Sequence, residues 1–218
     1  MASSPAPLGA PRRGNRLTRA FGSLVLRAIG FHVEGVVPDL PKAVVVAAPH
    51  TANRDIIVAL AAKVSLGVHV HWLGKHTVFW PPLGWLLRWL GGVPVDRRSP
   101  QATVAQAVAL FGAREQLFLG MAPEGTRRRV ERWRTGFHRI ATGAKVPIIP
   151  LALDYGARAV RIDPPIAPTG DVASDVAALR RRYTAAMAKY PDRFSSNDRP
   201  GAGSDAECAS AGPGSHEV

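Results

Sequence analysis

The sequence predicts an α/β fold: one domain with a largely parallel central sheet flanked by helices and preceded by an amphipathic N-terminal helix. Two observations support this prediction. Apolar, β-branched runs alternate along the chain with segments of helical spacing, which is the pattern of parallel strands joined by crossover helices. The composition, 46% hydrophobic and 20% charged over 218 residues, is typical of a globular chain with one full core.

The two ends of the chain are expected to lie outside this domain. Residues 1–14 are rich in Pro, Ala, Gly and Arg, and predict a flexible leader. Residues 192–218 are rich in Ser, Gly, Ala and acidic residues, and predict a disordered tail. The domain is therefore expected to span residues 15–191.

The first expected element is a helix over about 15–30. At about 100° per residue, Arg16, Arg19 and Arg27 lie within about 80° of one another. An apolar cluster lies next to this stripe, made of Leu17, Phe21, Leu24 and Ala28. Such a helix can lie in a lipid interface, or it can be a surface helix that packs its apolar side on the domain. Both interpretations stay open.

Strands and helices are then expected in alternation. The expected strands span residues 42–48, 68–73, 93–95, 117–121 and 146–153. Pro147 and Pro150 favour an edge or irregular position for the last of them. The expected helices span about residues 54–64, 83–90, 103–116 and 171–189.

The net charge of the chain indicates which kinds of partner it binds. The formal net charge is +12; residues 195–218 carry four acidic residues and one arginine, which gives −3, so the preceding residues carry +15. A body this basic favours an anionic partner, either nucleic acid or an anionic lipid surface. We predict no membrane-spanning helix, because the best apolar stretch, residues 77–95, is interrupted by Pro81-Pro82, Arg88 and the Gly91-Gly92 pair.

A histidine and an aspartate follow the first long strand. On a continuous helix His50 and Asp55 would lie roughly 140° apart and could not touch. If the strand ends at His50 and a helix begins near Asn53, the turn can return the carboxylate to the imidazole. The carboxylate would then fix the tautomer and free the other ring nitrogen to act as a base. A loop histidine followed by an acidic first helical turn gives the same pattern.

A second polar segment, residues 123–129 (PEGTRRR), follows the strand expected at 117–121. A glycine, a hydroxyl and a guanidinium together are suited to phosphate binding, although three consecutive arginines also fit a solvated loop. A third segment, residues 91–97 (GGVPVDR), places Arg97 after a short strand. Taken by itself, this segment predicts only a turn.

Other chemistries are less well supported. His69 and His71 share a strand face, but no Cys or carboxylate lies nearby at ligand spacing, so we predict no metal site. The chain contains no G-x-S-x-G hydrolase motif. The single cysteine, Cys208, lies in the polar tail and is a poor candidate nucleophile.

Taken in order, these blocks resemble the glycerolipid acyltransferases of the lysophosphatidic acid acyltransferase type. The segment HTANRD is similar to the family's HxSNxD box, with Ala52 at the usual serine, and its ends are His50 and Asp55. The Gly-Gly-x4-Arg block ends at Arg97, and the EGTR box is complete. Residues 146–150 (VPIIP) resemble the fourth block, so the resemblance covers roughly residues 44–155. The EGTR box is formed by Glu124, Gly125, Thr126 and Arg127.

The resemblance implies transfer of an acyl group from acyl-CoA or acyl carrier protein, as donor substrate, to a lysophospholipid hydroxyl, with no cofactor or metal. His50 would be the general base and Asp55 would orient it, without a covalent enzyme intermediate. Arg97 and the Glu124, Gly125, Thr126 and Arg127 box would hold the acceptor phosphate. The acceptor would be 1-acylglycerol-3-phosphate, giving phosphatidic acid.

An amphiphilic acceptor favours the membrane as the anionic partner, so the resemblance implies a peripheral or monotopic protein on the cytoplasmic face. Trp80, Trp85 and Trp89 are suited to an interface, or belong to the core. Three alternatives stay open: another acceptor such as a lyso-ornithine lipid or lysophosphatidylglycerol, a basic nucleic-acid-binding protein, and an inactive scaffold. No nucleic-acid-binding motif is evident.

Overall fold

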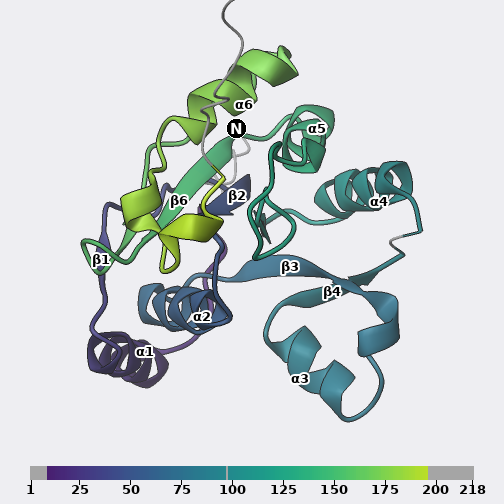
Figure 1. Cartoon of the computed structure of the whole chain (residues 1–218). Helices are drawn as coiled ribbons and strands as arrows, with labels where there is room; N and C mark the ends of the chain where they lie inside the picture. Colours follow the sequence, from purple (N-terminus) through teal and green to yellow (C-terminus); the bar gives the residue numbers. More distant parts are fainter. Residues whose placement is uncertain (1–8, 97, 196–218) are drawn as a thin grey trace, which may run out of the picture.

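The computed structural model describes residues 9–96 and 98–195 as one α/β domain (Figure 1). Within these residues seven strands form one sheet in the order β1-β7-β6-β2-β5-β3-β4. Neighbouring strands run parallel, except that β6 and β7 are antiparallel. The strands are β1 (His32–Glu34), β2 (Lys42–Ala48), β3 (Val70–Lys75), β4 (Gly92–Val95), β5 (Leu117–Met121), β6 (Ile148–Asp154) and β7 (Ala159–Ile162).

Six α-helices are found in the described residues: α1 (Arg16–Ala28), α2 (Arg54–Leu66), α3 (Leu83–Trp89), α4 (Pro100–Gly112), α5 (Gly136–Ala144) and α6 (Val172–Arg180). The chain crosses the sheet in one direction through α2 and α3 and returns through α4 and α5. Because parallel crossovers are right-handed, α2 and α3 cover one face of the sheet and α4 and α5 cover the other. Figure 1 shows this separation, with α1 beside α2.

The fold class and most elements predicted from the sequence are confirmed. The central strands β2 and β5 begin and end where the apolar runs predicted. Every residue of both strands is buried or partly buried, because helices cover both faces of a parallel sheet. The α-helix and strands that were not predicted are α5, which spans only nine residues, and β1 and β7, which span three and four.

Two predictions about the second half of the chain are wrong. The last helix ends at Arg180 instead of continuing to residue 189, because Tyr183 turns inward and donates a hydrogen bond to the Val46 carbonyl at 3.2 Å. Strand β6 is internal, between β2 and β7, so of the two positions that Pro147 and Pro150 favoured, an edge or an irregular strand, the edge is wrong. The chain tolerates Pro150 because it lies just beyond the ladder with β7, which begins at the Leu151–Ile162 pair.

The domain also extends beyond the predicted boundaries. At the N-terminal side Ala10 is buried and Arg12 forms a β-bridge with Val68, so residues 9–14 pack on the domain. At the C-terminal side Phe194 and Ser195 are buried, so the domain continues past residue 191. Residues 1–8 and 196–218, the rest of the predicted leader and tail, lie outside the described residues.

Helix α1 does not pack its apolar stripe on the domain. Leu17, Phe21 and Leu24 are 79%, 66% and 66% exposed. The helix instead contacts α2 through Gly22, where an added Cβ would lie 2.5 Å from the Ser65 nitrogen. The stripe of Leu17, Phe21 and Leu24 is therefore exposed, although α1 does pack on the domain through another side that buries Gly22 and Leu26.

Candidate active site

The candidate site lies at the carboxyl ends of three neighbouring strands. Strand β2 leads to His50, β5 leads to Glu124, and β6 leads to Tyr155. Because β2 lies between β5 and β6 and all three run parallel, the loops after them meet at one edge of the sheet.

The backbone turn between β2 and α2 brings His50 and Asp55 together. His50 Nδ1 lies 3.1 Å from Asp55 Oδ2, and the Asp55 side chain is only 1% exposed. Since a carboxylate accepts, Nδ1 carries the proton and donates it, which leaves Nε2 as the basic nitrogen. The structure thus pairs the two residues as the sequence predicts.

Three further donors hold the Asp55 carboxylate. Oδ2 accepts the backbone N–H groups of Thr51 and Ala52, each at 2.8 Å, and Oδ1 accepts the Tyr155 hydroxyl at 2.7 Å. Burial acts to raise the pKa of Asp55, but the hydrogen bonds from His50, Ala52 and Tyr155 outweigh it and leave the pKa below its ordinary value. Asp55 is therefore an ionised, fixed acceptor beside the imidazole.

Glu124 supports the same loop from the neighbouring strand. It is 2% exposed, and its Oε2 accepts the backbone N–H of His50 at 2.7 Å. Burial raises its pKa to about 7, against the opposing hydrogen bond from His50. Its other oxygen, Oε1, is buried and has no hydrogen-bond partner among the described residues. Glu124 thus ties the His50 loop to the end of β5.

Gly125 allows the chain to turn sharply after Glu124. Its φ of +66° is unfavourable for other residues, and an added Cβ would lie 2.6 Å from Arg134 Nε. The turn is closed by the Gly125 N–H, which donates to the Ala122 carbonyl at 3.1 Å. Glycine here sends Thr126 and Arg127 out toward solvent.

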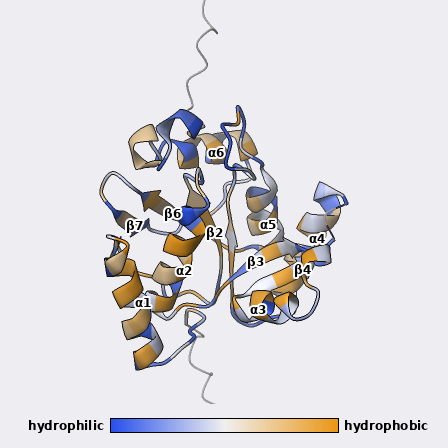
Figure 2. Ribbon diagram, turned by 60° about the horizontal axis from the view of Figure 1, so that its bottom comes forward, coloured by the Kyte–Doolittle hydropathy of each residue, from blue (hydrophilic) through white to orange (hydrophobic). Residues whose placement is uncertain are grey.

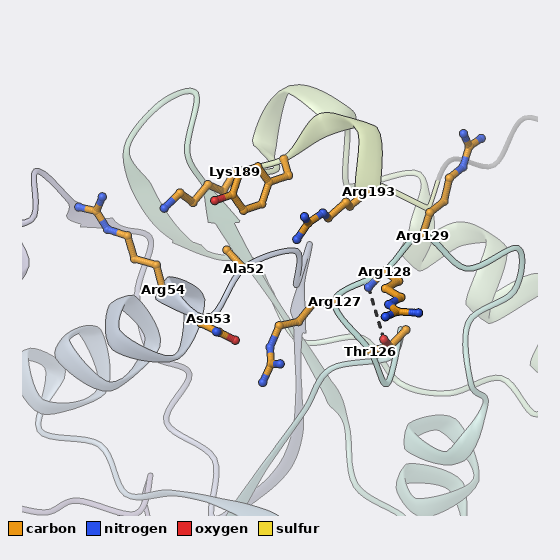
Figure 3. A pocket seen from close by; sticks show the side chains of 10 residues that line it. Ala52, Asn53, Arg54, Thr126, Arg127, Arg128, Arg129, Lys189 and Arg193 are labelled. Carbon is orange, nitrogen blue, oxygen red and sulfur yellow. Dashed lines mark hydrogen bonds between the residues drawn. The ribbon is translucent and has the colours of Figure 1, made fainter.

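A basic pocket lies beside the His50 loop, with a volume of about 730 Å³ (Figure 3). Its lining includes Thr126 and Arg127 from the EGTR box, whereas His50, Glu124 and Gly125 do not line it. Six cationic side chains line it, and no carboxylate does among the described residues: Arg54, Arg127, Arg128, Arg129, Lys189 and Arg193. The pocket is suited to an anion.

Comparisons with known proteins agree with this arrangement. A family model described as Acyltransferase matches residues 30–154, more than half of the chain. The chain belongs to the acyltransferase family. The fold is similar to the crystal structure of the 1-acyl-sn-glycerophosphate acyltransferase PlsC from Thermotoga maritima, with 17% identity and a TM-score of 0.50. That similarity covers 77% of this chain and 78% of the other. No curated protein gave a significant match.

The predicted acyltransferase is thus confirmed at the level of family and fold. His50, Asp55 and the EGTR box lie in the matched region of this acyltransferase and meet at one edge of its sheet. Arg97, predicted to bind the acceptor phosphate, lies outside the described residues.

Among the residues of the site that sequence reasoning missed, three come from distant parts of the chain. Tyr155 contacts Asp55, and Lys189 and Arg193 line the pocket. The position of Tyr155 directly after a strand that neighbours β2 was the available signal. Lys189 and Arg193 were assigned to a helix and to a tail, and their approach to the site depends on tertiary packing.

The histidines considered as metal ligands lie near β3. The rings of His69 and His71 are 4.1 Å apart, and Arg13 Nη1 lies 3.1 Å from His69 Nε2. Burial, followed by the charges of Lys63 and Arg13, lowers the pKa of His69 to about 4. No group of three or more His, Cys, Asp or Glu residues within the described ranges is arranged to hold a metal ion.

Proposed function

We propose that this acyltransferase transfers a fatty acyl group from acyl-CoA or acyl carrier protein to the free hydroxyl of a lysophospholipid, with 1-acylglycerol-3-phosphate as the best-supported acceptor. The observation that carries the proposal is the 3.1 Å contact between His50 Nδ1 and Asp55 Oδ2 beside a pocket lined by cations. The dyad suits a hydroxyl acceptor, and the pocket suits a phosphate.

His50 acts as the general base. Its Nε2 takes the proton of the acceptor hydroxyl as the oxygen attacks the thioester carbonyl. The resulting tetrahedral intermediate expels the thiolate, which recovers the proton from His50, so the base is regenerated. Asp55 orients the imidazole and stabilises its protonated form, and the fixed position of Asp55 keeps Nε2 aimed at one place.

The pocket binds the acceptor phosphate. A phosphate monoester carries close to two negative charges at neutral pH, and guanidinium groups pair with it through planar, bidentate hydrogen bonds. Arg127 of the EGTR box lines the pocket. Another anionic lysolipid would bind in the same pocket. The zwitterionic lyso-ornithine lipid would pair with fewer of the pocket's positive charges.

The acyltransferase also binds an anionic membrane surface. Most of the large apolar side chains that are exposed in the described residues lie on or next to α1, α2 and α3. They are Leu17, Phe21, Leu24, Ile56, Ile57, Val78, Trp80, Leu83, Trp85, Leu86 and Trp89. Figure 2 shows apolar stretches on both α1 and α3, and no described helix is long and apolar enough to cross a bilayer. The exposed apolar side chains of α1 and α3 favour binding in the membrane interface, with cations near the lipid head groups.

The test is release of free thiol from a long-chain acyl-CoA by purified protein in detergent. We expect release that depends on lysophosphatidic acid and is lost in His50→Ala. His32→Ala is the matched control, because the His32 side chain is 57% exposed and its ion-pair partner among the described residues is nearby Glu34. Protein that is inactive with this pair is then given acyl carrier protein and other lysolipids. Inactivity of folded protein across that panel would overturn the proposal, and tight duplex binding at physiological salt would favour the nucleic-acid alternative.

A further inference from the structure

The segment after α6 crosses the loop that holds the dyad. We call residues 187–195 the C-terminal strap. Its Tyr190 N–H donates to Thr51 Oγ1 at 3.3 Å, and Arg193 Nη1 donates to the Thr51 carbonyl at 3.4 Å. Thr51 directly follows His50, so the strap contacts the site next to the base.

Buried residues fix the strap at both ends. Met187 and Ala188 are buried at its start, and Phe194 and Ser195 are buried at its end. Ser195 Oγ also accepts the Val130 N–H at 3.1 Å. The exposed residues between these anchors are therefore held over the pocket at a set distance from the core.

Two cations of the strap face the pocket that also contains Arg127. Lys189 Nζ and Arg193 Cζ lie 5.6 Å and 4.6 Å from the centre of the Tyr190 ring. These contacts stack both side chains on one aromatic residue and limit their rotamers. In Figure 3 Arg193 extends toward the loop with Ala52, whereas Arg54 and Arg129 point outward.

We propose that Lys189 and Arg193 form a second wall of the phosphate site and bind the phosphate of the lysophospholipid acceptor opposite Arg127. This inference rests on the proposed function. A phosphate held between Arg127 and the strap lies next to Thr51, and the glycerol hydroxyl of the same molecule is then brought toward His50. The acceptor is favoured over the donor because Thr126 and Arg127 of the EGTR box share one pocket with the strap, next to the loop that carries the proposed base.

The experiment measures equilibrium binding of two lipids in one detergent by calorimetry. One lipid is a lysophosphatidic acid, and the other is the monoacylglycerol with the same chain, which lacks the phosphate. The variant is Lys189→Ala with Arg193→Gln. The control is Arg139→Ala, an exposed arginine of α5 that does not line the pocket. We expect the double variant to bind lysophosphatidic acid at least about tenfold more weakly, since each lost contact is a charged hydrogen bond.

The preference for the phosphorylated lipid is the decisive readout. Unchanged affinity for lysophosphatidic acid overturns the inference, and so does an equal loss for both lipids, which would mean general damage to the site. A rise confined to the KM for acyl-CoA overturns the assignment to the acceptor. If wild-type protein transfers the acyl group and the double variant still binds lysophosphatidic acid normally, only this inference is rejected. If wild-type protein binds lysophosphatidic acid but transfers an acyl group to no lysolipid, only the proposed function is rejected.

Discussion

The Tyr155 hydroxyl donates a 2.7 Å hydrogen bond to Oδ1 of Asp55, on the carboxylate whose Oδ2 faces His50. Tyr155 follows β6, and Asp55 lies in the first turn of α2. Burial, and then the hydrogen bond and charge of Asp55, raise the pKa of Tyr155, so the hydroxyl stays a donor at any working pH. The tyrosine thus fixes the rotation of the carboxylate that contacts His50, the proposed base.

Replacing this donor is expected to lower turnover without weakening substrate binding. In Tyr155→Phe we expect kcat to fall about 10- to 150-fold with KM nearly unchanged, because a neutral-to-charged hydrogen bond of about 1.5–3 kcal/mol is lost. Steady-state kinetics on lysophosphatidic acid measure this. Tyr183→Phe is the matched control, since it also removes a buried hydroxyl contact, to the Val46 carbonyl, but leaves the dyad intact. An equal fall in kcat in both variants would assign Tyr155 a purely structural role.

Asp55→Asn tests the orientation of the imidazole directly. The amide keeps the size of the carboxylate but presents a donor or a neutral acceptor to His50, so the tautomer is no longer enforced. We expect kcat to fall about 10²- to 10⁴-fold, while calorimetry shows lysophosphatidic acid bound with similar affinity. Activity within about threefold of wild type would contradict the dyad.

The raised pKa of Glu124 predicts that the stability of the fold depends on pH. Its folded pKa of about 7 lies above the ordinary 4.5, so the folded state keeps the proton longer than the unfolded state does. The contribution of Glu124 to the free energy of unfolding is therefore fully present below about pH 4.5. It is lost as the pH rises through about 7, at up to about 1.4 kcal/mol per pH unit.

Urea unfolding between pH 5 and pH 8 measures this effect. Glu124→Gln removes the ionisation and keeps an oxygen that can accept the His50 N–H, so we expect a smaller loss of unfolding free energy over that range than in wild type. The difference between the two proteins isolates Glu124 from other titrating groups. Parallel pH profiles would show that Glu124 does not titrate there.

Helix α1 predicts binding to anionic vesicles. We expect the triple change Leu17→Ser, Phe21→Ser and Leu24→Ser to weaken partitioning into phosphatidylglycerol vesicles at least about tenfold, because three apolar side chains no longer enter the interface. Co-sedimentation measures this, and thermal unfolding checks that the variant folds. Val36→Ser is the control, since Val36 is 82% exposed but lies on none of the three helices. Unchanged vesicle binding by the triple variant would exclude α1 as a docking element.

The central strands and the dyad could be predicted because their signals are local. The run at 42–48 is buried on both faces and reads as a continuous apolar strand, and the H-x4-D spacing follows from the turn after it. Strand β7 has only four residues, and helix α5 has an amphipathic pattern but spans only nine residues, so neither was predicted. Helix α6 has a helical pattern through residue 189, but burial of Tyr183 and Met187 ends it early, which is a tertiary effect.

The parts of the site that were missed come from far along the chain. The Tyr155–Asp55 contact joins residues 100 positions apart, and the strap meets Thr51 across about 140 positions. No local pattern encodes such pairings. They become visible only once the strand order places β6 beside β2 and the packing of Tyr183 turns the chain back over the site.

The C-terminal strap determines where the shortest fragment with an intact core and site can end. A piece cut where the family match ends, at residue 154, would lose the hydroxyl that holds Asp55, along with the antiparallel partner of β6. Cutting at residue 187 would restore both but remove Phe194, whose buried ring belongs to the main core. A working catalytic unit must therefore run through Ser195, forty-one residues past the boundary that sequence similarity would suggest.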